Sequence, residues 1–591
     1  MTDTPLFTFA VIADTHINAE DGVSGSPWPA NRLANDRARW AVAALNADTP
    51  AFVVHLGDMV HPIPTQPGYG AAAARYHEMF AGLNAPLYCL PGNHDLGDKP
   101  VDWMPAHPVT APFLSAYEQT FGPLWQAFTH GGCRFVLHAN PILGADLPQD
   151  AAQWAWLEGE LAASRGERVF FLTHYPLFLT TPDEPEHYDN LAPGPRERLR
   201  ALLVNQRVEA VFAAHVHTIF HTPLAPDGPM QHVIPALSAM RLDYSHLFKT
   251  PPRDWQENGR NDSAKLGYYL VDVYPQGYAL RLRRSHGACL GAGEVAAPVA
   301  AVSRASLRAG ALNVGVDLRQ GWAEPRIIPY TGVVDEFRRK AARNDYLITA
   351  LQEAGLRDLR VPLDDLTDPA TQARIRDLAR MGHRFQPFAF APPDSAAQAA
   401  IAALPGALAR IEVIARADRL PDMISAWRDI AGSAGVPLIA SKLWTSADVQ
   451  GTGAAFSHFI GHGFTAADTA LLAQVHGAGA GGAVFRIAPD ECPQEVIAAL
   501  PESGTAVVYL TLSDLNPARI NADDAAIKRR VLSALAATEA HPARPVLMID
   551  TLEDLDRGYY PRHGLYDGQF NPRPAGLALA LAAERRAALS G

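Results

Sequence analysis

The chain has 591 residues, which is too many for one hydrophobic core, so we expect two or more domains. Its apolar content of 48% is ordinary, and its formal net charge of −12 argues against a general nucleic-acid binder, because an acidic surface repels polyanions. The cysteines are far apart and form no CxxC pair, which favours a reducing compartment over a disulfide framework or a thiolate zinc site. They are Cys89, Cys133, Cys289 and Cys492.

The ends of the sequence carry no leader or anchor signal. A strand-like run begins within a few residues of Met1, which leaves no room for a signal peptide. No apolar run reaches the length of a membrane span, because Glu584, Arg585 and Arg586 interrupt the Ala-rich tail. We therefore expect a soluble, cytoplasmic protein with no membrane and no nucleic-acid partner. The sequence leaves homo-oligomerisation open.

In the first half, strand-like runs alternate with helical segments, which predicts a largely parallel sheet with crossover helices. The strand-like runs are residues 7–13, 52–56, 86–90, 169–172 and 210–213, and the helical segments are residues 31–45, 71–82, 153–163 and 196–205. Runs at 231–236, 268–274 and 278–283 look antiparallel and would close this domain. An Ala/Gly/Val-rich stretch follows, so we predict a first domain over residues 1–290 and a linker over residues 291–310.

The second half is another β/α series, from which we predict a (β/α)₈-barrel-like domain over residues 311–591. Its strand candidates are residues 312–318, 359–363, 385–391, 411–415, 437–442, 456–460, 483–487, 507–512 and 546–549. Helical stretches lie between most of them, at residues 345–354, 371–381, 422–434, 466–476 and 523–539. Because nine candidates exceed the eight strands of such a barrel, one of them is wrong or lies outside it.

Polar clusters follow the five strand-like runs named first. They are Asp14-Thr15-His16, Gly57-Asp58, Gly92-Asn93-His94-Asp95, His174 and His215-Val216-His217. The carboxyl ends of parallel strands converge on one edge of a sheet, where α/β folds place their sites. That edge would carry carboxylates, imidazoles and an amide together, which is what a pair of divalent transition ions needs.

The spacing within the clusters suits metal chelation. Asp14 and His16 are two residues apart at a strand end, so in extended geometry they would point to the same side and could chelate one ion. His215 and His217 would again share one side of an extended segment. Asp58 has two carboxylate oxygens and can bridge two ions. Any one of these clusters arises easily by chance, because a lone His is usually a structural residue. The ordered set carries the signal.

In order, spacing and flanking strands, these clusters resemble the signature of the calcineurin-like metallophosphoesterase superfamily. The resemblance covers about half of the chain and is greatest to the bacterial branch that includes cyclic-nucleotide and glycerophosphodiester phosphodiesterases. It implies a metallophosphoesterase β-sandwich flanked by helices, and two metal sites that share one carboxylate. By this resemblance the first ion is held by Asp14, His16, Asp58 and His217, and the second by Asp58, Asn93, His174 and His215.

The resemblance also implies roles around the ions. His94 would sit beside the scissile phosphate without binding metal, and Asp95 would orient His94. The last family motif usually has Gly before its first His, whereas this chain has Ala214. Both histidines of the motif remain, so we expect the metal site to be kept.

Clues to the substrate are fewer. Asn18 follows the first metal motif and Tyr175 follows His174, so either could reach a substrate. His187 lies in a Pro-rich insert, residues 182–195, which is a candidate lid and equally well a solvated loop.

The implied chemistry is hydrolysis of a small-molecule phosphate ester. Two close cations lower the pKa of a bridging water, so we predict dinuclear metal-dependent hydrolysis of a small phosphodiester by a metal-bridging hydroxide. Phosphomonoester hydrolysis on the same site stays open, because the metal core does not decide between them. Oxygen and nitrogen ligands accept Mn, Fe, Co or Zn, so the sequence does not identify the ions. A scaffold that only binds a partner is a further alternative, although every inferred ligand type is present.

The barrel suggests an alternative in which it acts on carbohydrates and the phosphoesterase half is auxiliary. Acidic residues lie near its strand ends, and the tail over residues 556–574 faintly resembles the last strand and loop of glycoside-hydrolase barrels. Such families carry an Asn directly before the catalytic Glu of the fourth strand, whereas Ile411 precedes Glu412 in this chain. We therefore favour a catalytically silent barrel. His458 and His462 suggest a further metal site, but isolated histidines on an apolar strand are more often structural.

Overall fold

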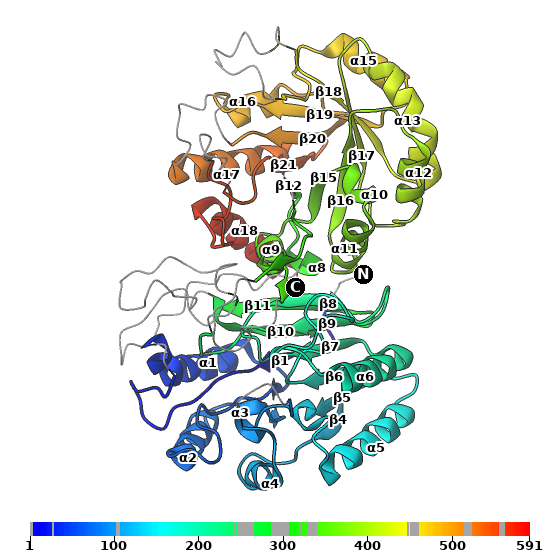
Figure 1. Ribbon diagram of the computed structural model, residues 1–591. Helices are drawn as coiled ribbons and strands as arrows, with labels where there is room; N and C mark the ends of the chain where they lie inside the picture. The colour runs from blue at the N-terminus through cyan, green and yellow to red at the C-terminus, as the bar shows by residue number, and fades with distance from the viewer. Residues whose placement is uncertain are drawn as a thin grey trace. The chain divides into compact units, whose positions relative to one another are not determined.

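The structure is a computed structural model, shown in Figure 1. It describes residues 4–26, 29–101, 107–241, 244, 265–284, 307–318, 321–328, 340–445, 448, 460–512, 523–554 and 562–590. The chain forms two compact units, one from Met1–Arg304 with Pro325–Tyr346 and the other from Ala305–Glu324 with Leu347–Gly591. The predicted linker lies mostly outside the described residues, so the predicted boundaries stay a prediction. No described helix combines the length and the apolar character that a membrane span requires.

The described part of the N-terminal unit contains two large β-sheets and one two-stranded sheet. The first has five strands in the order β11 (Tyr278–Arg284), β10 (Gly267–Val273), β1 (Phe7–Ile12), β2 (Val53–His55) and β3 (Leu87–Cys89). The second has six, in the order β4 (Gln126–His130), β5 (Cys133–His138), β6 (Arg168–Thr173), β7 (Ala210–Ala213), β9 (Met230–Val233) and β8 (Phe220–Pro223). The inner strands β1–β2–β3 and β5–β6–β7–β9 are parallel, so their carboxyl ends share a direction within each sheet.

Aromatic rings hold the two sheets face to face. The ring of Phe9 on β1 lies 5.1 Å from Phe135 on β5, 5.6 Å from Phe170 on β6 and 6.1 Å from Phe212 on β7. All four side chains are fully buried. Alternation along each strand sends the other side chains to the outer faces, where helices cover them.

Helices complete a four-layer sandwich (Figure 1). In one apolar cluster, α1 (Ala34–Asp48), α2 (Tyr69–Phe80) and α4 (Ala111–Thr120) pack on the first sheet, and in another, α5 (Pro148–Ala163) and α6 (Pro193–Gln206) pack on the second. The predicted metallophosphoesterase-type sandwich is thereby confirmed. Strands β4, β5 and β8 were not predicted, and the single parallel sheet inferred from strand order is in fact two sheets.

The second unit is a closed barrel of eight parallel strands. They are β12 (Val314–Asp317), β15 (Asp358–Pro362), β16 (Arg384–Ala389), β17 (Ile411–Ala415), β18 (Leu438–Lys442), β19 (Gly482–Ile487), β20 (Thr505–Leu510) and β21 (Val546–Ile549). The helices around it include α9 (Tyr346–Glu353), α11 (Pro369–Arg380), α12 (Ser395–Ala402), α13 (Leu420–Ala434), α15 (Thr469–Gly477), α16 (Pro493–Ala498), α17 (Asp524–Ala540) and α18 (Pro574–Ser590). The predicted barrel is confirmed. Of the ninth strand candidate, residues 456–459 lie outside the described residues.

One short segment does not follow the division into halves. Strands β13 (Arg326–Ile327) and β14 (Ala341–Ala342) pair with each other and belong to the N-terminal unit, although they lie between β12 and β15 in the sequence. The chain therefore passes between the two units three times. Cys89, Cys133 and Cys492 form no disulfide, and Cys289 lies outside the described residues.

The barrel interior holds a charged network where branched aliphatic layers are usual. Arg360 on β15 donates to both carboxylate oxygens of Glu412 on β17, at 2.6 and 3.1 Å, and to Asp317 on β12 at 3.0 Å. Gln386 on β16 also donates to Glu412, at 2.8 Å, and Tyr509 on β20 donates to Asp317. Each charge is buried and each carboxylate has several donors, so the network is a fully paired structural core.

We predict that Arg360→Met destabilises the barrel by about 3–5 kcal/mol, because it leaves two buried carboxylates without their cation. Urea unfolding followed by a probe of the barrel would measure this loss. Arg416→Met is the matched control, since Arg416 is exposed and its ion pair among the described residues is with the exposed Asp418. An equal effect of the two substitutions would contradict the assignment.

Candidate metal centre

The five polar clusters lie at the carboxyl ends of strands in both sheets. Asp14, Asp58 and Asn93 follow β1, β2 and β3 of the first sheet. His174 and the pair His215 and His217 follow β6 and β7 of the second. One sheet edge was expected to carry them, whereas two edges contribute to the site.

The backbone at these clusters is bent into left-handed conformations. The φ angles are +53° at Asp14, +43° at His16, +56° at Asp58, +69° at His215 and +56° at His217. Non-glycine residues rarely adopt such angles, and they concentrate at functional sites that the surrounding fold holds in place. The expectation that Asp14 with His16 and His215 with His217 share one side of an extended strand was therefore wrong. Sharp turns follow the strands, which end at Ile12 and Ala213. After these turns Asp14 and His16 lie in one ligand group, whereas His215 and His217 lie in different groups.

The first group of candidate ligands is Asp14, His16 and His217. The Nε2 atoms of His16 and His217 lie 3.2 Å apart, and Asp14 Oδ1 lies 3.4 Å from His217 Nε2. Both carboxylate oxygens of Asp14 are buried and accept no hydrogen bond. A buried carboxylate without donors is unfavourable unless a cation compensates it, so Asp14 fits a metal ligand.

The second group is Asp58, His174 and His215, with Asn93 between the histidines. Asn93 Oδ1 lies 3.0 Å from His174 Nε2 and 2.9 Å from His215 Nδ1. Asp58 joins the two groups, since its Oδ1 lies 3.5 Å from His174 Nε2 and its Oδ2 lies 3.5 Å from His16 Nε2. This carboxylate is thus placed to serve two ions.

The hydrogen bonds of two histidines show which ring nitrogen directs its lone pair into the candidate site. His174 Nδ1 donates to the Leu56 carbonyl at 2.7 Å, and His217 Nδ1 donates to the Ala239 carbonyl at 2.9 Å. A carbonyl only accepts, so in a neutral ring Nε2 carries the lone pair toward the candidate site. These lone pairs face the other oxygen and nitrogen acceptors of the two groups. Acceptor atoms at such distances repel one another unless a cation lies between them.

Burial keeps two of these imidazoles neutral, as metal ligation requires. Desolvation, reinforced by the charge of His94, lowers the pKa of His16, and desolvation with the nearby Arg241 guanidinium lowers that of His215. For His217, burial acts in the same direction, but the Asp14 carboxylate outweighs it and raises the pKa. The donor set therefore fits divalent transition ions of the kind that bind imidazole and carboxylate together.

His94 borders both groups. Its backbone N–H donates to Asp58 Oδ1 at 2.8 Å, and its ring lies 4.5 Å from that of His16. Its Nδ1 lies 2.6 Å from the carbonyl oxygen of His61 and donates to it. His61, which the sequence analysis missed, also brings its imidazole near the rings of His16 and His94. The signal for it was weak, namely a His three residues after Asp58.

Asp95 is expected to orient His94, and this role stays a prediction, because the hydrogen bonds of its carboxylate within the described residues go to backbone N–H groups. Its carboxylate accepts from the backbone N–H groups of Gly92 and Asp58, both at 2.8 Å, and of Met59 at 3.3 Å. Asp95 thus joins the loop after β2 to the loop after β3. It holds the backbone of Asp58, while the His61 carbonyl holds the ring of His94.

The three predicted substrate contacts are buried and bonded within the protein. Asn18 donates from its side chain to the Asn31 carbonyl at 3.2 Å, and the Tyr175 hydroxyl donates to Asp98 at 3.0 Å. His187 pairs with Glu184 at 3.2 Å. The predicted contact of these residues with a substrate stays a prediction.

Other residues also lie near the second group, where the ring of Tyr175 is 4.2 Å from that of His215. The ring of Tyr188 lies 4.8 Å from that of His215, and its hydroxyl accepts from Asn93 at 3.4 Å. Asp189 Oδ1 lies 3.7 Å from His215 Nε2, and Arg241 Nη1 donates to the His215 carbonyl at 3.0 Å. Tyr188 and Asp189 belong to the predicted insert, but Arg241 follows no strand-end pattern.

Ala214 fits its position without strain. It is not among the described residues with positive φ, and its N–H donates to the His174 carbonyl at 2.7 Å. Glycine's freedom is therefore not needed there. At Gly92 the opposite holds, because an added Cβ would lie 2.2 Å from Asp58 Oδ1 and 2.6 Å from His174 Cε1.

We predict that Gly92→Ala removes metal binding, because the new methyl group would displace the Asp58 carboxylate and the His174 ring. Metal content after dialysis, measured by elemental mass spectrometry, would report the loss. Gly159→Ala is the control, since an added Cβ at Gly159 on α5 meets nothing within 4 Å. A Gly92→Ala protein with full metal content would refute the close packing described.

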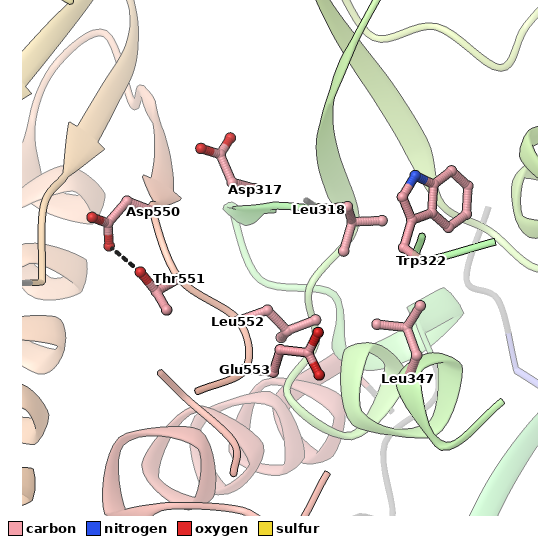
Figure 2. A pocket seen from close by; sticks show the side chains of 8 residues that line it. All are labelled: Asp317, Leu318, Trp322, Leu347, Asp550, Thr551, Leu552 and Glu553. Carbon is pink, nitrogen blue, oxygen red and sulfur yellow. Dashed lines mark hydrogen bonds between the residues drawn. The ribbon is translucent and has the colours of Figure 1, made fainter. Parts of the chain in front are cut away.

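The barrel has a pocket of its own at the carboxyl ends of its first and last strands (Figure 2). Its walls include Asp317, Leu318, Trp322, Leu347, Asp550, Thr551, Leu552 and Glu553. Asp550 accepts from the Thr551 hydroxyl at 3.0 Å and from the Leu512 N–H at 3.1 Å. Glu412 does not line the pocket, and its carboxylate is held by Arg360. The tail segment 556–561 and His458 lie outside the described residues.

Comparison with known proteins agrees with this geometry. Residues 7–218 match the family model described as calcineurin-like phosphoesterase, so the N-terminal unit carries a calcineurin-like phosphoesterase domain. The resemblance that the motifs indicated is confirmed at the level of the superfamily.

Individual relatives are identical to this region at about a quarter to a third of the aligned positions. Mouse (Mus musculus) serine/threonine-protein phosphatase CPPED1 is 29% identical over 206 residues, which cover 33% of this chain and 61% of the relative. A probable cyclic nucleotide phosphodiesterase of Rhodopseudomonas palustris is 32% identical over 175 residues, covering 29% and 58%. Purple acid phosphatase 22 of Arabidopsis thaliana is 26% identical over 230 residues, covering 35% and 51%. The matched region thus spans about half to three fifths of these relatives.

Proposed function

We propose that the N-terminal unit is a dinuclear metal-dependent hydrolase of small phosphodiesters. One observation carries the proposal: two groups of buried oxygen and nitrogen ligands share Asp58 where the two sheet edges meet. The similarity to proteins named phosphatases and a cyclic nucleotide phosphodiesterase supports phosphoester hydrolysis as the reaction class. The bacterial relative favours a diester, while phosphomonoesters are the alternative substrate of the same site.

The residues divide into two sets by position. Asp14, His16, Asp58 and His217 would hold one ion, and Asp58, Asn93, His174 and His215 would hold the other. Two bound cations would supply an activated water and neutralise charge on the phosphate during in-line attack. Manganese, iron, cobalt and zinc all suit these ligands.

His94 is the group suited to proton transfer. Its Nδ1 is engaged by the His61 carbonyl, which leaves Nε2 for the substrate. His94 is only partly buried, unlike the residues proposed as ligands. As water attacks phosphorus and the bond to the leaving oxygen breaks, a protonated His94 would donate its Nε2 proton to that oxygen. The fixed ring orientation makes this donation directional.

We predict that Asp58→Asn abolishes hydrolysis of bis(p-nitrophenyl) phosphate, because it weakens both metal sites at once. His94→Gln should lower kcat about 10²–10⁴-fold while leaving metal content unchanged, as expected for loss of an acid. Steady-state kinetics and metal analysis on the same samples separate the two effects. The metal-depleted wild type should be inactive and should recover on adding one of the four ions.

The panel of substrates includes p-nitrophenyl phosphate, so that the rates also rank diesters against monoesters. Hydrolysis by rigorously metal-free protein, or full activity of Asp58→Asn, would overturn the proposal. A protein that binds two ions but hydrolyses neither ester would favour the alternative of a binding module.

The barrel pocket is the observation that favours a second candidate, a carbohydrate-active barrel. Asp317, Asp550 and Glu553 bring carboxylates to the strand ends, where barrel enzymes carry their sites. Against catalysis, Asp317 and Glu412 are both occupied by Arg360. A retaining glycosidase needs two carboxylates free to act as nucleophile and acid.

We predict no release of p-nitrophenol from aryl glycosides above the buffer rate, because Asp317 and Glu412 pair with Arg360 in the barrel core. The assay uses the full-length protein with α- and β-linked glucosides, galactosides and xylosides. If the protein did hydrolyse an aryl glycoside, and if Asp550→Asn abolished this activity while Asp554→Asn kept it, the barrel would be a carbohydrate-active enzyme instead.

A further inference from the structure

A buried carboxylate outside the ligand groups lies behind His215. Asp189 is fully buried. It is surrounded by three donors: Arg241 Nη2 at 2.6 Å, the Tyr244 hydroxyl at 2.7 Å and Lys340 Nζ at 2.7 Å. Its Oδ1 points toward His215 Nε2 at 3.7 Å. One carboxylate thus connects a candidate metal ligand to two cations.

The two nitrogens of His215 have different surroundings. Nδ1 lies 2.9 Å from Asn93 Oδ1, within the second group of ligands. Nε2 is buried and makes no hydrogen bond within the described residues. If Nδ1 is to present a lone pair to an ion, Nε2 must carry the proton, and a protonated Nε2 needs an acceptor behind it. Asp189 Oδ1, which also pairs with Arg241 Nη2 at 2.6 Å, is the carboxylate oxygen that lies nearest, at 3.7 Å.

The donors fix the position of this carboxylate. Lys340 and Tyr244 both bind Oδ2, while Arg241 approaches Oδ1 and also donates to the His215 carbonyl at 3.0 Å. The guanidinium of Arg241 lies 4.8 Å from the ring of Tyr188. Oδ2 is therefore saturated, and Oδ1 remains directed toward the imidazole. The negative charge of Asp189 also offsets cations that would otherwise repel a metal ion.

Lys340 reaches this position from a distant part of the sequence. It directly precedes β14, in the segment that lies between barrel strands β12 and β15 in sequence but packs in the N-terminal unit. Two further side chains bind this segment to β8. Arg343 donates to Thr222 at 3.0 Å, and Asp345 accepts from the His221 N–H at 2.8 Å. The matched family region ends at residue 218, well before this segment.

We propose that Asp189 is a positioning residue for His215, and that Lys340 holds Asp189 in place, so that the segment between the first two barrel strands completes the metal centre. The proposal rests on the proposed function for the presence of ions, but it concerns residues outside the family motifs. It makes the phosphoesterase site dependent on a stretch of chain that lies within the sequence of the barrel.

The first test is metal binding by Asp189→Asn in the full-length protein. We expect the apparent Kd of the second ion to rise about 10–100-fold, the usual effect of losing a partner behind a ligating histidine, while the first ion binds nearly as in the wild type. Titration of the apo protein with Co²⁺, followed by visible absorption and calorimetry, resolves the two ions. Thermal unfolding of the apo proteins reports whether the variant is folded.

The second test concerns Lys340. Lys340→Met should weaken the second ion as well, Lys340→Arg should restore it, and Lys340→Met should add little in the Asp189→Asn background, because the lysine acts through the carboxylate. Lys528→Met on α17 is the control, since Lys528 is exposed. If Asp189→Asn does not fold, the comparison of Lys340→Met with Lys340→Arg still decides.

The outcomes separate this inference from the proposed function. A wild type that binds fewer than two Co²⁺ ions would overturn the dinuclear site itself. A wild type that binds two, with unchanged second-ion affinity in Asp189→Asn and Lys340→Met, would overturn only the positioning role. Losses that add in the double variant would show that Lys340 does not act through Asp189.

Discussion

The N-terminal unit depends on holding mutually repelling acceptor atoms together in a buried space. Lone pairs of imidazoles, carboxylates and an amide face one another at about 3 to 3.5 Å, and the buried Asp14 carboxylate is left without a hydrogen-bond donor among the described residues. In a protein without a cation such an arrangement would disperse or take up protons, since buried charge must be compensated. The same contacts become favourable once positive ions lie among them. The fold therefore holds the ligand atoms in place against their mutual repulsion, and bound ions would supply the attraction that offsets this repulsion.

That rigidity comes from elements on either side of the ligands. The sheets are fixed to each other by the rings of Phe9, Phe135 and Phe170, so the strand ends keep their spacing. Asp95 then joins two ligand-bearing loops through their backbone N–H groups. Left-handed residues after β1, β2 and β7 turn the ligands inward, at a cost of order 1–3 kcal/mol each that the packed core must offset. Loops of this kind could not hold such angles without the sandwich behind them.

Much of this arrangement could be predicted from sequence because strand ends and ligands are adjacent in the chain. The apolar runs before Asp14, Asp58 and His174 identified both the strands and the residues that follow them. Strands β4 and β8 carry no comparable run: Gln126–His130 is mostly polar, and Phe220–Pro223 ends in proline at a sheet edge. The division into two sheets was not evident either, since parallel strands in two sheets give the same β/α alternation as strands in one.

Side chains that meet only through tertiary packing were beyond local patterns. Asp189 and Lys340 are 151 residues apart, and nothing near either residue indicates the other. Arg360 and Glu412 give a parallel case in the barrel, where a glutamate that looked like a candidate for chemistry is held by an arginine from a neighbouring part of the barrel wall. In both units a buried carboxylate is paired with a cation, but the consequences differ. Asp317 and Glu412 share Arg360 and form a paired core inside the barrel. Asp189, in contrast, keeps one oxygen directed at a histidine of the site. A buried acidic residue therefore indicates a functional role only when one of its carboxylate oxygens remains directed at a residue of the site.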